Sequence, residues 1–286
     1  MKPRTPPRND TDDGQRRLAM LIDADNAQPS VIEGLLAEVA KYGVASVKRI
    51  YGDFTSTRMT QWKQALLKHS ISPVQQFAYT SGKNATDSSL IIDAMDLLYT
   101  QRFDGFCLVS SDSDFTRLAQ RLREEGLTVY GFGERKTPDA FVQACDKFVY
   151  TEVLRTEASP GAAPKPVAAK PAAAAKKAAK SAPPKSAPVA APAPPAPAAD
   201  AKDKASEPLP IALIRQAIEE ASDEGGWAFL GTVGSYLNKI RPDFDPRLYG
   251  HRKLSDLLKH QPRHFVIEER GVPGSSNKMI YIRAVG

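Results

Sequence analysis

The residues of this chain that are best suited to chemistry are acids that follow apolar segments of strand length. Strands lying side by side in one sheet would bring such carboxylates close together, where like charges raise one another's pKa or require a cation. Carboxylate oxygens without nearby His or Cys suit hard ions such as Mg²⁺ or Mn²⁺. The residues concerned are Asp23, Asp25 and Asn26 after the segment 18–22, Ser111, Asp112 and Asp114 after 105–110, and Asp87 at the expected start of a helix.

Each of these acids also has a purely structural alternative. Asp is a common N-cap, because its carboxylate accepts a free backbone N–H at the start of a helix, where the helix dipole also favours negative charge. Asp is frequent in the loops that join a strand to the next helix for the same reason. The set is therefore either one metal site or a series of separate caps, depending on whether the carboxylates meet.

Strands and helices that would position these acids are predicted by the sequence pattern, in which short apolar segments alternate with segments whose apolar residues have helical spacing. This repetition predicts an α/β fold with a mostly parallel sheet and helices on both of its faces. In such folds ligands bind beyond the carboxyl ends of the strands, near a switch point in strand order. The expected strands are 18–22, 45–52, 73–79, 105–110, 127–133 and 147–150, and the expected helices are 29–43, 59–68, 87–99, 115–125 and a short one near Ala140.

Composition divides the chain into folding and non-folding segments. Residues 158–199 contain six lysines and no acid, and eleven of the 23 prolines lie between positions 160 and 197. Such a segment cannot bury enough apolar surface to fold alone. The predicted organisation is a disordered tail at 1–17, a domain at 18–155, an Ala/Pro/Lys-rich disordered linker at 156–207 and a second domain at 208–284.

The net charge of +6 comes mainly from that linker, since residues 18–157 carry 15 basic and 18 acidic groups. Any affinity of the first domain for a polyanion must therefore come from local patches. No apolar run is long enough to span a bilayer, and the N-terminus lacks the apolar core of a signal peptide. These features predict a cytoplasmic protein without a membrane partner. Cys107 and Cys145 lie in apolar segments and are expected to be buried free thiols.

The C-terminal region predicts three helices, at 209–222, 229–240 and 247–260, and a hairpin of strands 264–270 and 278–283, which together make a winged helix. Between positions 236 and 264 there are seven Lys or Arg and three Asp. This local excess could bind RNA phosphates and stack on unpaired bases; the alternative is that it only solvates the outer face of the third helix. The candidates are Lys239, Arg241, Arg247, Arg252 and Lys253 for the backbone, and Tyr249 and His251 for stacking.

Three ordered blocks, MLIDADN, GKNATDSSLIIDAMDLLY and FCLVSSDSDFTRLAQRLREEGLTVYGFG, resemble the NYN domain, the LabA-like branch of the PIN-like nuclease superfamily, over residues 18–152. The resemblance implies a PIN-like, Rossmannoid sheet and a metal-dependent ribonuclease, an endonuclease, that uses Mg²⁺ or Mn²⁺. A phosphatase of the haloacid dehalogenase class also begins with an acid pair such as Asp23 and Asp25, but that alternative does not explain the SSDSDF block.

The resemblance also implies roles for single residues. The matching catalytic and metal-binding positions are Asp23, Asp87, Asp112 and Asp114, and the matching supporting positions are Asn26, which orients the first acid, and Asp93. Ser111 is a neighbour of these acids and is the supporting candidate for touching phosphate. Asp93 ranks below the four ligands, because it lies six residues from Asp87, about 240° round a helix. Lys83 is a candidate for neutralising substrate phosphate.

The segment GTVGSYLNKIRPDFDPRLYGHRKLSDLLKHQPRHFVIEE resembles the LOTUS or OST-HTH domain, which is associated with RNA binding. Together the two resemblances predict a ribonuclease domain tethered to an RNA-binding winged helix, with single-stranded or structured RNA as the partner. The winged helix is also a candidate for docking a protein partner. The leading alternative function is a regulatory protein that binds RNA without cutting it.

Overall fold

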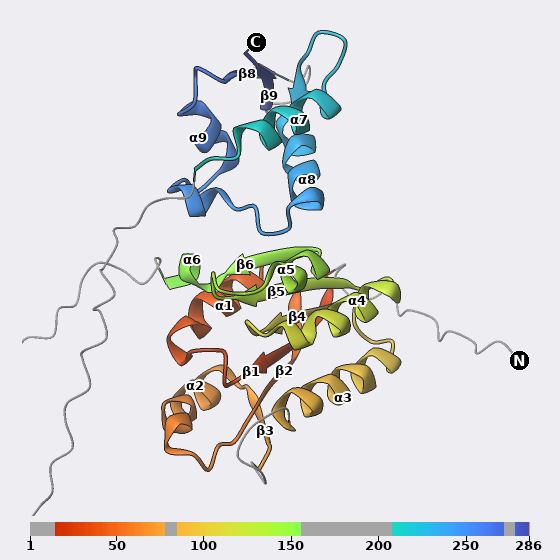
Figure 1. The fold of residues 1–286 in the computed structure, drawn as a ribbon, viewed down its shortest axis with the longest axis vertical. Coiled ribbons are helices and arrows are strands. Elements are labelled where there is room, and N and C mark those ends of the chain that lie inside the picture. Colours follow the sequence, from red (N-terminus) through yellow and green to blue (C-terminus); the bar gives the residue numbers. More distant parts are fainter. Residues whose placement is uncertain (1–14, 78–84, 156–207, 272–277, 286) are drawn as a thin grey trace, which may run out of the picture. The chain divides into compact units, whose positions relative to one another are not determined.

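The computed structural model describes residues 15–77, 85–155, 208–271 and 278–285 (Figure 1). The predicted linker, most of the predicted tail and Lys83 lie outside the described residues. The described residues form an N-terminal part, residues 15–155, and a C-terminal part, residues 208–285.

A sheet of six strands forms the centre of the N-terminal part, in the order β3-β2-β1-β4-β5-β6. Every neighbouring pair is parallel, so the predicted parallel sheet is confirmed. From β1 the chain builds outward through β2 and β3, and from β4 it builds outward in the opposite direction, which makes the β1–β4 pair a switch point. The strands are β1 (Arg17–Asp23), β2 (Val44–Gly52), β3 (Ser72–Gln75), β4 (Gly105–Val109), β5 (Thr128–Gly133) and β6 (Lys147–Tyr150).

Helices cover both faces of this sheet, as predicted. One apolar core lies between the sheet and the helices α3, α4 and α5, and a second lies between the sheet and α1, α2 and α6. Short 3-10 turns precede α1, α2 and α4, so these helices begin later than the sequence pattern predicts. The helices are α1 (Ile32–Val39), α2 (Trp62–His69), α3 (Ala85–Tyr99), α4 (Thr116–Glu124), α5 (Asp139–Ala144) and α6 (Thr151–Arg155).

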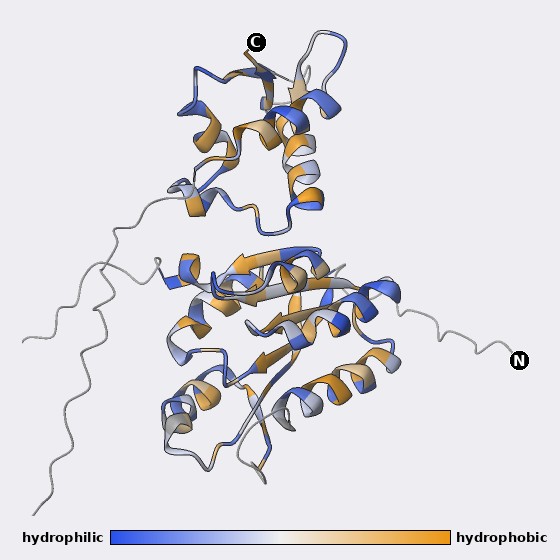
Figure 2. Ribbon diagram, viewed as in Figure 1, coloured by the Kyte–Doolittle hydropathy of each residue, from blue (hydrophilic) through white to orange (hydrophobic). Residues whose placement is uncertain are grey.

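Strand β1, which is hydrophobic along most of its length (Figure 2), shows how the sheet aims its polar end. Leu18 and Met20 belong to the core beneath α1 and α2, whereas Ala19 and Leu21 belong to the core beneath α3, α4 and α5. Side chains alternate between the faces of a strand. Asp23 continues the odd-numbered series and therefore lies on the side of α3 and α4.

The C-terminal part consists of three helices and a small antiparallel sheet in the order β7-β9-β8. It contains one more strand than the predicted hairpin, because the two residues of β7 pair with β9. Ile214, Leu237 and Ile282 are fully buried in a core shared by helices and sheet. The elements are α7 (Ile211–Ala221), β7 (Ala228–Phe229), α8 (Leu230–Ile240), α9 (Leu254–Lys259), β8 (Phe265–Gly271) and β9 (Lys278–Ala284).

The prediction of one continuous third helix over 247–260 is wrong. A 3-10 turn at Pro246–Tyr249 and the separate helix α9 replace it. Gly250 between them has a φ of 82°, in the left-handed region that favours glycine and stops a right-handed helix.

Two further sequence expectations concern burial and membranes. Cys107 and Cys145 are free and buried, as expected from their apolar surroundings, and burial raises the pKa of both thiols. Among the described residues, no helix is both long and apolar enough to cross a membrane.

Candidate metal centre

Three acids from two separate elements meet beyond the carboxyl end of β4. Asp87 lies in the first turn of α3, and Asp112 and Asp114 lie in the segment that joins β4 to α4. One carboxylate oxygen from each lies within 4.8 Å of the others. We call these three residues the acid group. Their position at the β1–β4 switch point is where ligands bind in parallel α/β sheets.

Local backbone geometry fixes two members of the acid group. Asp112 caps the 3-10 turn Ser113–Phe115, because its Oδ1 accepts the N–H of Asp114 at 2.9 Å. The N–H of Asp112 is in turn donated to Ser110 Oγ at 3.1 Å. The capping alternative from the sequence therefore holds for Asp112, and this capping residue still has an oxygen in the acid group. Capping and clustering are not exclusive.

Asp23 is fully buried beside the acid group and is held by three donors. Its Oδ2 accepts Asn26 Nδ2 at 2.7 Å and the Ser110 hydroxyl at 2.8 Å, and its Oδ1 accepts the N–H of Asp25 at 3.0 Å. Burial raises the pKa of Asp23, and these hydrogen bonds oppose that rise. Asp23, a predicted metal ligand, does not belong to the acid group, which is the set found among the described residues with oxygens within 4.8 Å of one another.

The acid group is electrostatically unbalanced. The pKa of Asp87 is raised to about 6, first by partial burial and then by the negative charges of Asp23, Asp112 and Asp114. At neutral pH these carboxylates are held together at a cost in free energy that a bound cation removes. The donor set consists of carboxylate oxygens, which fits a hard divalent ion such as Mg²⁺ or Mn²⁺.

Two supporting residues of the sequence prediction have hydrogen bonds to residues outside the acid group. Asp93 of α3 accepts hydrogen bonds from Arg49 and Tyr51 of β2. Ser111 Oγ accepts the N–H of Glu134 at 2.8 Å. Both side chains are thus engaged in holding neighbouring segments of the domain.

Ser110 is the residue that sequence reasoning missed. Its hydroxyl links Asp23 to the backbone of Asp112, so it connects the ends of β1 and β4. The signal was present in the sequence: Phe106 and Leu108 face the core beneath α3, and a period of two assigns Ser110 to the same side. Ser111 comes one residue later and falls outside that alternation.

The predicted RNA-binding residues of the C-terminal part divide into two classes. Arg241 pairs with Asp243 at 3.2 Å, and Arg247 pairs with Asp245 at 2.6 Å. These two guanidinium groups are therefore balanced by acids two residues away. The other three candidates, Lys239, Arg252 and Lys253, are exposed, and no ion pair is found for them among the described residues.

The two stacking candidates have ring partners. The ring centroid of Tyr249 lies 6.0 Å from that of Phe244, and the ring centroid of His251 lies 4.6 Å from that of His260.

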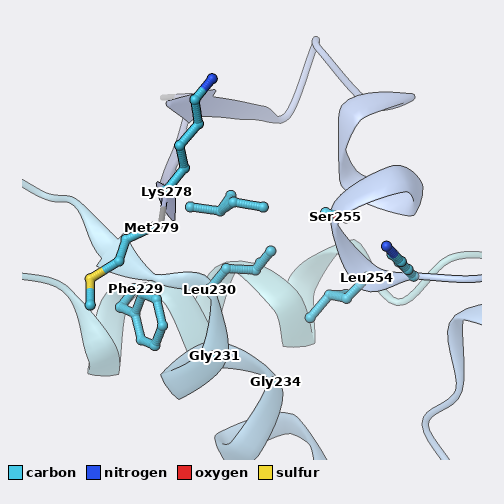
Figure 3. A pocket seen from close by; sticks show the side chains of 10 residues that line it. Phe229, Leu230, Gly231, Gly234, Leu254, Ser255, Lys278 and Met279 are labelled. Carbon is cyan, nitrogen blue, oxygen red and sulfur yellow. The ribbon is translucent and has the colours of Figure 1, made fainter. Parts of the chain in front are cut away.

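Lys253 also lines an apolar pocket of about 460 Å³ (Figure 3). The other residues around it come from the ends of β7 and β9 and from α8 and α9: Phe229, Leu230, Gly231, Gly234, Leu254, Ser255, Lys278, Met279 and Ile280.

Comparisons with known proteins agree with this arrangement. Residues 17–154 match the NYN domain family, and residues 205–276 match the OST-HTH/LOTUS domain family. No curated protein matches the chain.

Three solved structures are similar to parts of the chain. An uncharacterised protein of Nitrosomonas europaea is 50% identical with a TM-score of 0.27, and the match covers 32% of this chain and 88% of that one. A protein of unknown function from Vibrio parahaemolyticus is 22% identical with a TM-score of 0.40, covering 49% and 94%. A fragment, 175–257, of a Chromobacterium violaceum protein is 37% identical with a TM-score of 0.22, covering 27% and 80%.

The family matches, the parallel sheet and the acids at its switch point are consistent with one another. The NYN match covers the whole described N-terminal sheet, and the second match covers most of the helices and strands of the C-terminal part. The chain therefore contains an NYN domain, which belongs to the PIN-like nuclease superfamily, followed by an OST-HTH/LOTUS domain.

Proposed function

We propose that this protein is a cytoplasmic, Mg²⁺- or Mn²⁺-dependent ribonuclease that cuts RNA internally, and that its OST-HTH/LOTUS domain holds the RNA. The observation that carries the proposal is the acid group, Asp87, Asp112 and Asp114, whose oxygens converge within 4.8 Å. It lies in a domain of a nuclease superfamily, where a divalent ion bound by carboxylates suits phosphodiester hydrolysis.

The residues around the acid group have separate roles in this proposal. The acid group would hold the ion, which when bound would supply Lewis-acid activation of a water and offset charge on the scissile phosphate. Asp23 adds negative charge next to the group, and Asn26 and Ser110 hold its carboxylate in one orientation. No side chain needs to form a covalent bond with the substrate.

The environment of Asp23 also bears on the phosphatase alternative. In that alternative Asp23 would attack phosphorus as a covalent nucleophile. Its side chain is fully buried, and both of its oxygens accept hydrogen bonds from Asn26, Ser110 and the backbone of Asp25. These contacts fit a fixed electrostatic role better than nucleophilic attack. We expect no turnover of p-nitrophenyl phosphate, a general phosphatase substrate.

Substrate engagement is assigned to the exposed cations of the OST-HTH/LOTUS domain. Lys239, Arg252 and Lys253 are exposed, and no ion pair with an acid is found for them among the described residues. Such cations bind RNA phosphates without sequence preference and with a strong dependence on salt. The NYN domain then supplies the chemistry.

A cleavage assay tests the proposal. RNA labelled at the 5′ or the 3′ end is incubated with the wild type and with Asp112→Asn, in Mg²⁺, in Mn²⁺ and in EDTA. We expect internal cutting by the wild type with either ion, and no cutting in EDTA or by the variant. Asp139→Asn, at an exposed acid in the first turn of α5, is the matched control and should cut like the wild type.

The same assay separates the alternative functions. A folded wild type that binds RNA but does not cut it with either ion would identify a regulatory RNA-binding protein. Cutting that persists in EDTA or in Asp112→Asn would remove the acid group from the chemistry. Products only one nucleotide long would show removal of terminal nucleotides in place of internal cutting.

A further inference from the structure

Asp93 occupies a position on α3 that no role in metal binding explains. It lies six residues after Asp87 on the same helix, and its carboxylate is not part of the acid group. Its Oδ1 accepts a hydrogen bond from Arg49 Nη1, and its Oδ2 accepts one from the Tyr51 hydroxyl. Arg49 and Tyr51 both belong to β2. We call Arg49, Tyr51 and Asp93 the β2–α3 clamp.

The β2–α3 clamp is largely shielded from water, so its hydrogen bonds join the strand to the helix in one geometry. The side chain of Tyr51 is fully buried, and a buried hydroxyl requires a hydrogen-bond partner, which Asp93 supplies. The Asp93 side chain is 21% exposed, so its ion pair with Arg49 is partly shielded from water. The Asp93 contact raises the pKa of Arg49, and burial followed by the Asp93 contact raises the pKa of Tyr51, so both remain donors.

The same strand residue contacts the segment that carries Asp23. Tyr51 lies opposite Asp23 in the parallel register of β1 and β2, and the Tyr51 carbonyl accepts the N–H of Ala24 at 2.9 Å. The backbone of Tyr51 thus pairs with the end of β1, while its hydroxyl bonds to α3. A second link nearby runs from Gln76 Nε2 to Ser89 Oγ at 2.9 Å.

The first turn of α3 needs such an anchor. Its Asp87 lies with Asp112 and Asp114 so that one carboxylate oxygen of each is within 4.8 Å of the others, a distance at which like charges repel. The apolar side chains of α3, such as Leu90 and Ala94, pack against the sheet, but apolar contact alone is not directional. The two oxygens of Asp93 accept from two residues of β2, and because hydrogen bonds are directional, this pair of contacts restricts the rotation of α3 and its position along its axis. Asp93 is about 9 Å from Asp87 along that axis.

We propose that Asp93 is a positioning residue, which Arg49 and Tyr51 hold so that α3 presents Asp87 to Asp112 and Asp114. The proposal rests on the proposed function, because it assigns Asp93 a part in building the metal site of the nuclease. It differs from the implied role of Asp93 as one more acid of that site. Its effect reaches the metal only through Asp87.

A two-residue mutant cycle tests the proposal in the full-length protein. The variants are Asp93→Asn, Arg49→Gln and the pair together, and the main readout is the Kd for Mn²⁺, measured by calorimetry in the absence of RNA. Loss of a residue that orients a metal ligand typically weakens binding about 10- to 100-fold. We expect each single variant to weaken Mn²⁺ binding about tenfold and the pair to be no weaker than the worse single variant.

A metal-ligand role for Asp93 predicts a different pattern. Asp93→Asn would then weaken Mn²⁺ binding as much as Asp112→Asn does, and Arg49→Gln, which releases the carboxylate, would leave the affinity unchanged or raise it. Unchanged affinity in Asp93→Asn would also overturn the proposal. So would a wild type that binds no Mn²⁺, because no metal site would then depend on α3.

Milder variants guard against simple unfolding. Tyr51→Phe keeps the buried ring and removes only the hydroxyl, and it should weaken Mn²⁺ binding while the circular dichroism stays unchanged. Arg49→Lys keeps the charge and should recover part of the affinity that Arg49→Gln loses. Asp96→Asn removes an exposed charge from the same helix, three residues beyond Asp93, and is the matched control with wild-type affinity.

Rates of RNA cutting separate this proposal from the proposed function. If the wild type cuts RNA, Asp93→Asn should lower kcat and leave KM unchanged, because the RNA contacts lie elsewhere. If the wild type binds Mn²⁺ without cutting RNA, the nuclease function fails, and the calorimetric cycle still decides the role of Asp93.

Discussion

Charges are arranged in opposite ways in the acid group of the NYN domain and in residues 236–264 of the OST-HTH/LOTUS domain, which we call the basic segment. In the first, Asp87, Asp112 and Asp114 converge, and the pKa of Asp87 rises to about 6. In the second, Arg241 and Arg247 each pair with an Asp two residues away. Like charges that face one another cost free energy that a bound cation would remove, whereas opposite charges two residues apart balance one another.

The largest effect expected from this difference is the loss of metal-dependent chemistry in Asp112→Asn. Asn caps a helix about as well as Asp, so the contact with the Asp114 N–H survives while the charge is lost. Mn²⁺ affinity and RNA cutting should fall by at least about 100-fold with the melting temperature nearly unchanged. Isothermal calorimetry and the cleavage assay measure both. Retained Mn²⁺ affinity in a folded variant would break the comparison, because the acid group would then not be the ligand site.

The pH dependence of metal binding is the next largest effect. Metal ions bind the deprotonated carboxylate, and Asp87 takes up its proton as the pH falls through about 6. Below that pH the Mn²⁺ affinity should decrease about tenfold per pH unit for one competing proton. Calorimetry between pH 7.5 and pH 5 tests this. An affinity that stays constant down to pH 5 would show that the like charges do not act on Asp87.

Asp87 should make the stability of the metal-free protein depend on pH in the opposite sense to an acid whose pKa is lowered on folding. The folded-state pKa of Asp87 lies above its ordinary value, so its contribution to stability is present at low pH and is lost as the pH rises through about 6. Asp87→Asn should therefore stabilise the metal-free protein at pH 7, by about 1 kcal/mol after allowance for solvent screening and the helix dipole.

Thermal unfolding in EDTA at pH 7 and at pH 5 measures this effect. The gain from Asp87→Asn should be largest at pH 7 and smaller at pH 5, where Asp87 is mostly protonated in the folded protein. It disappears only below the ordinary pKa of 3.8, where the unfolded chain is protonated too. Mn²⁺ at pH 7 should stabilise the wild type and not the variant. Destabilisation by Asp87→Asn at pH 7 would identify the acid as a net stabilising group.

The smallest effect concerns the basic segment. Arg252→Gln and Lys253→Gln should each weaken RNA binding about threefold and reduce the dependence of the Kd on salt, because each removes one phosphate contact. Arg241→Gln should leave RNA affinity nearly unchanged, since its charge is already balanced by Asp243. Fluorescence anisotropy with a labelled RNA at two salt concentrations tests all three. Equal effects of the three variants would erase the distinction between exposed and locally paired cations.

Much of the fold could be predicted from local sequence because its signals are local. The apolar segments at 18–22 and 105–110 are β1 and β4, and their alternation already assigns Asp23 to one face of the sheet. The third helix of the C-terminal part was predicted wrongly for an equally local reason, since Gly250 in a left-handed conformation ends a pattern whose leucines continue with helical spacing.

The candidate site could be predicted only in part. Asp87, Asp112 and Asp114 were singled out by type and position, and the structure brings them together. The contacts of Ser110 and of Asp93 were not foreseen, because each joins elements that are distant in sequence. The alternation of β4 assigns Ser110 to one side of the sheet, but it cannot show a hydrogen bond to a residue 87 positions away.

The sequence by itself determined the α/β class, the strand ends that carry acids, the buried cysteines and the two family resemblances, because periodicity and motif spacing are properties of the chain. Only the tertiary structure decided that β1 and β4 are neighbours, that three acids converge within 4.8 Å and that Asp93 is bonded to β2. Strand order and helix placement come from burying both faces of one sheet at once, which minimises exposed apolar surface over the whole domain.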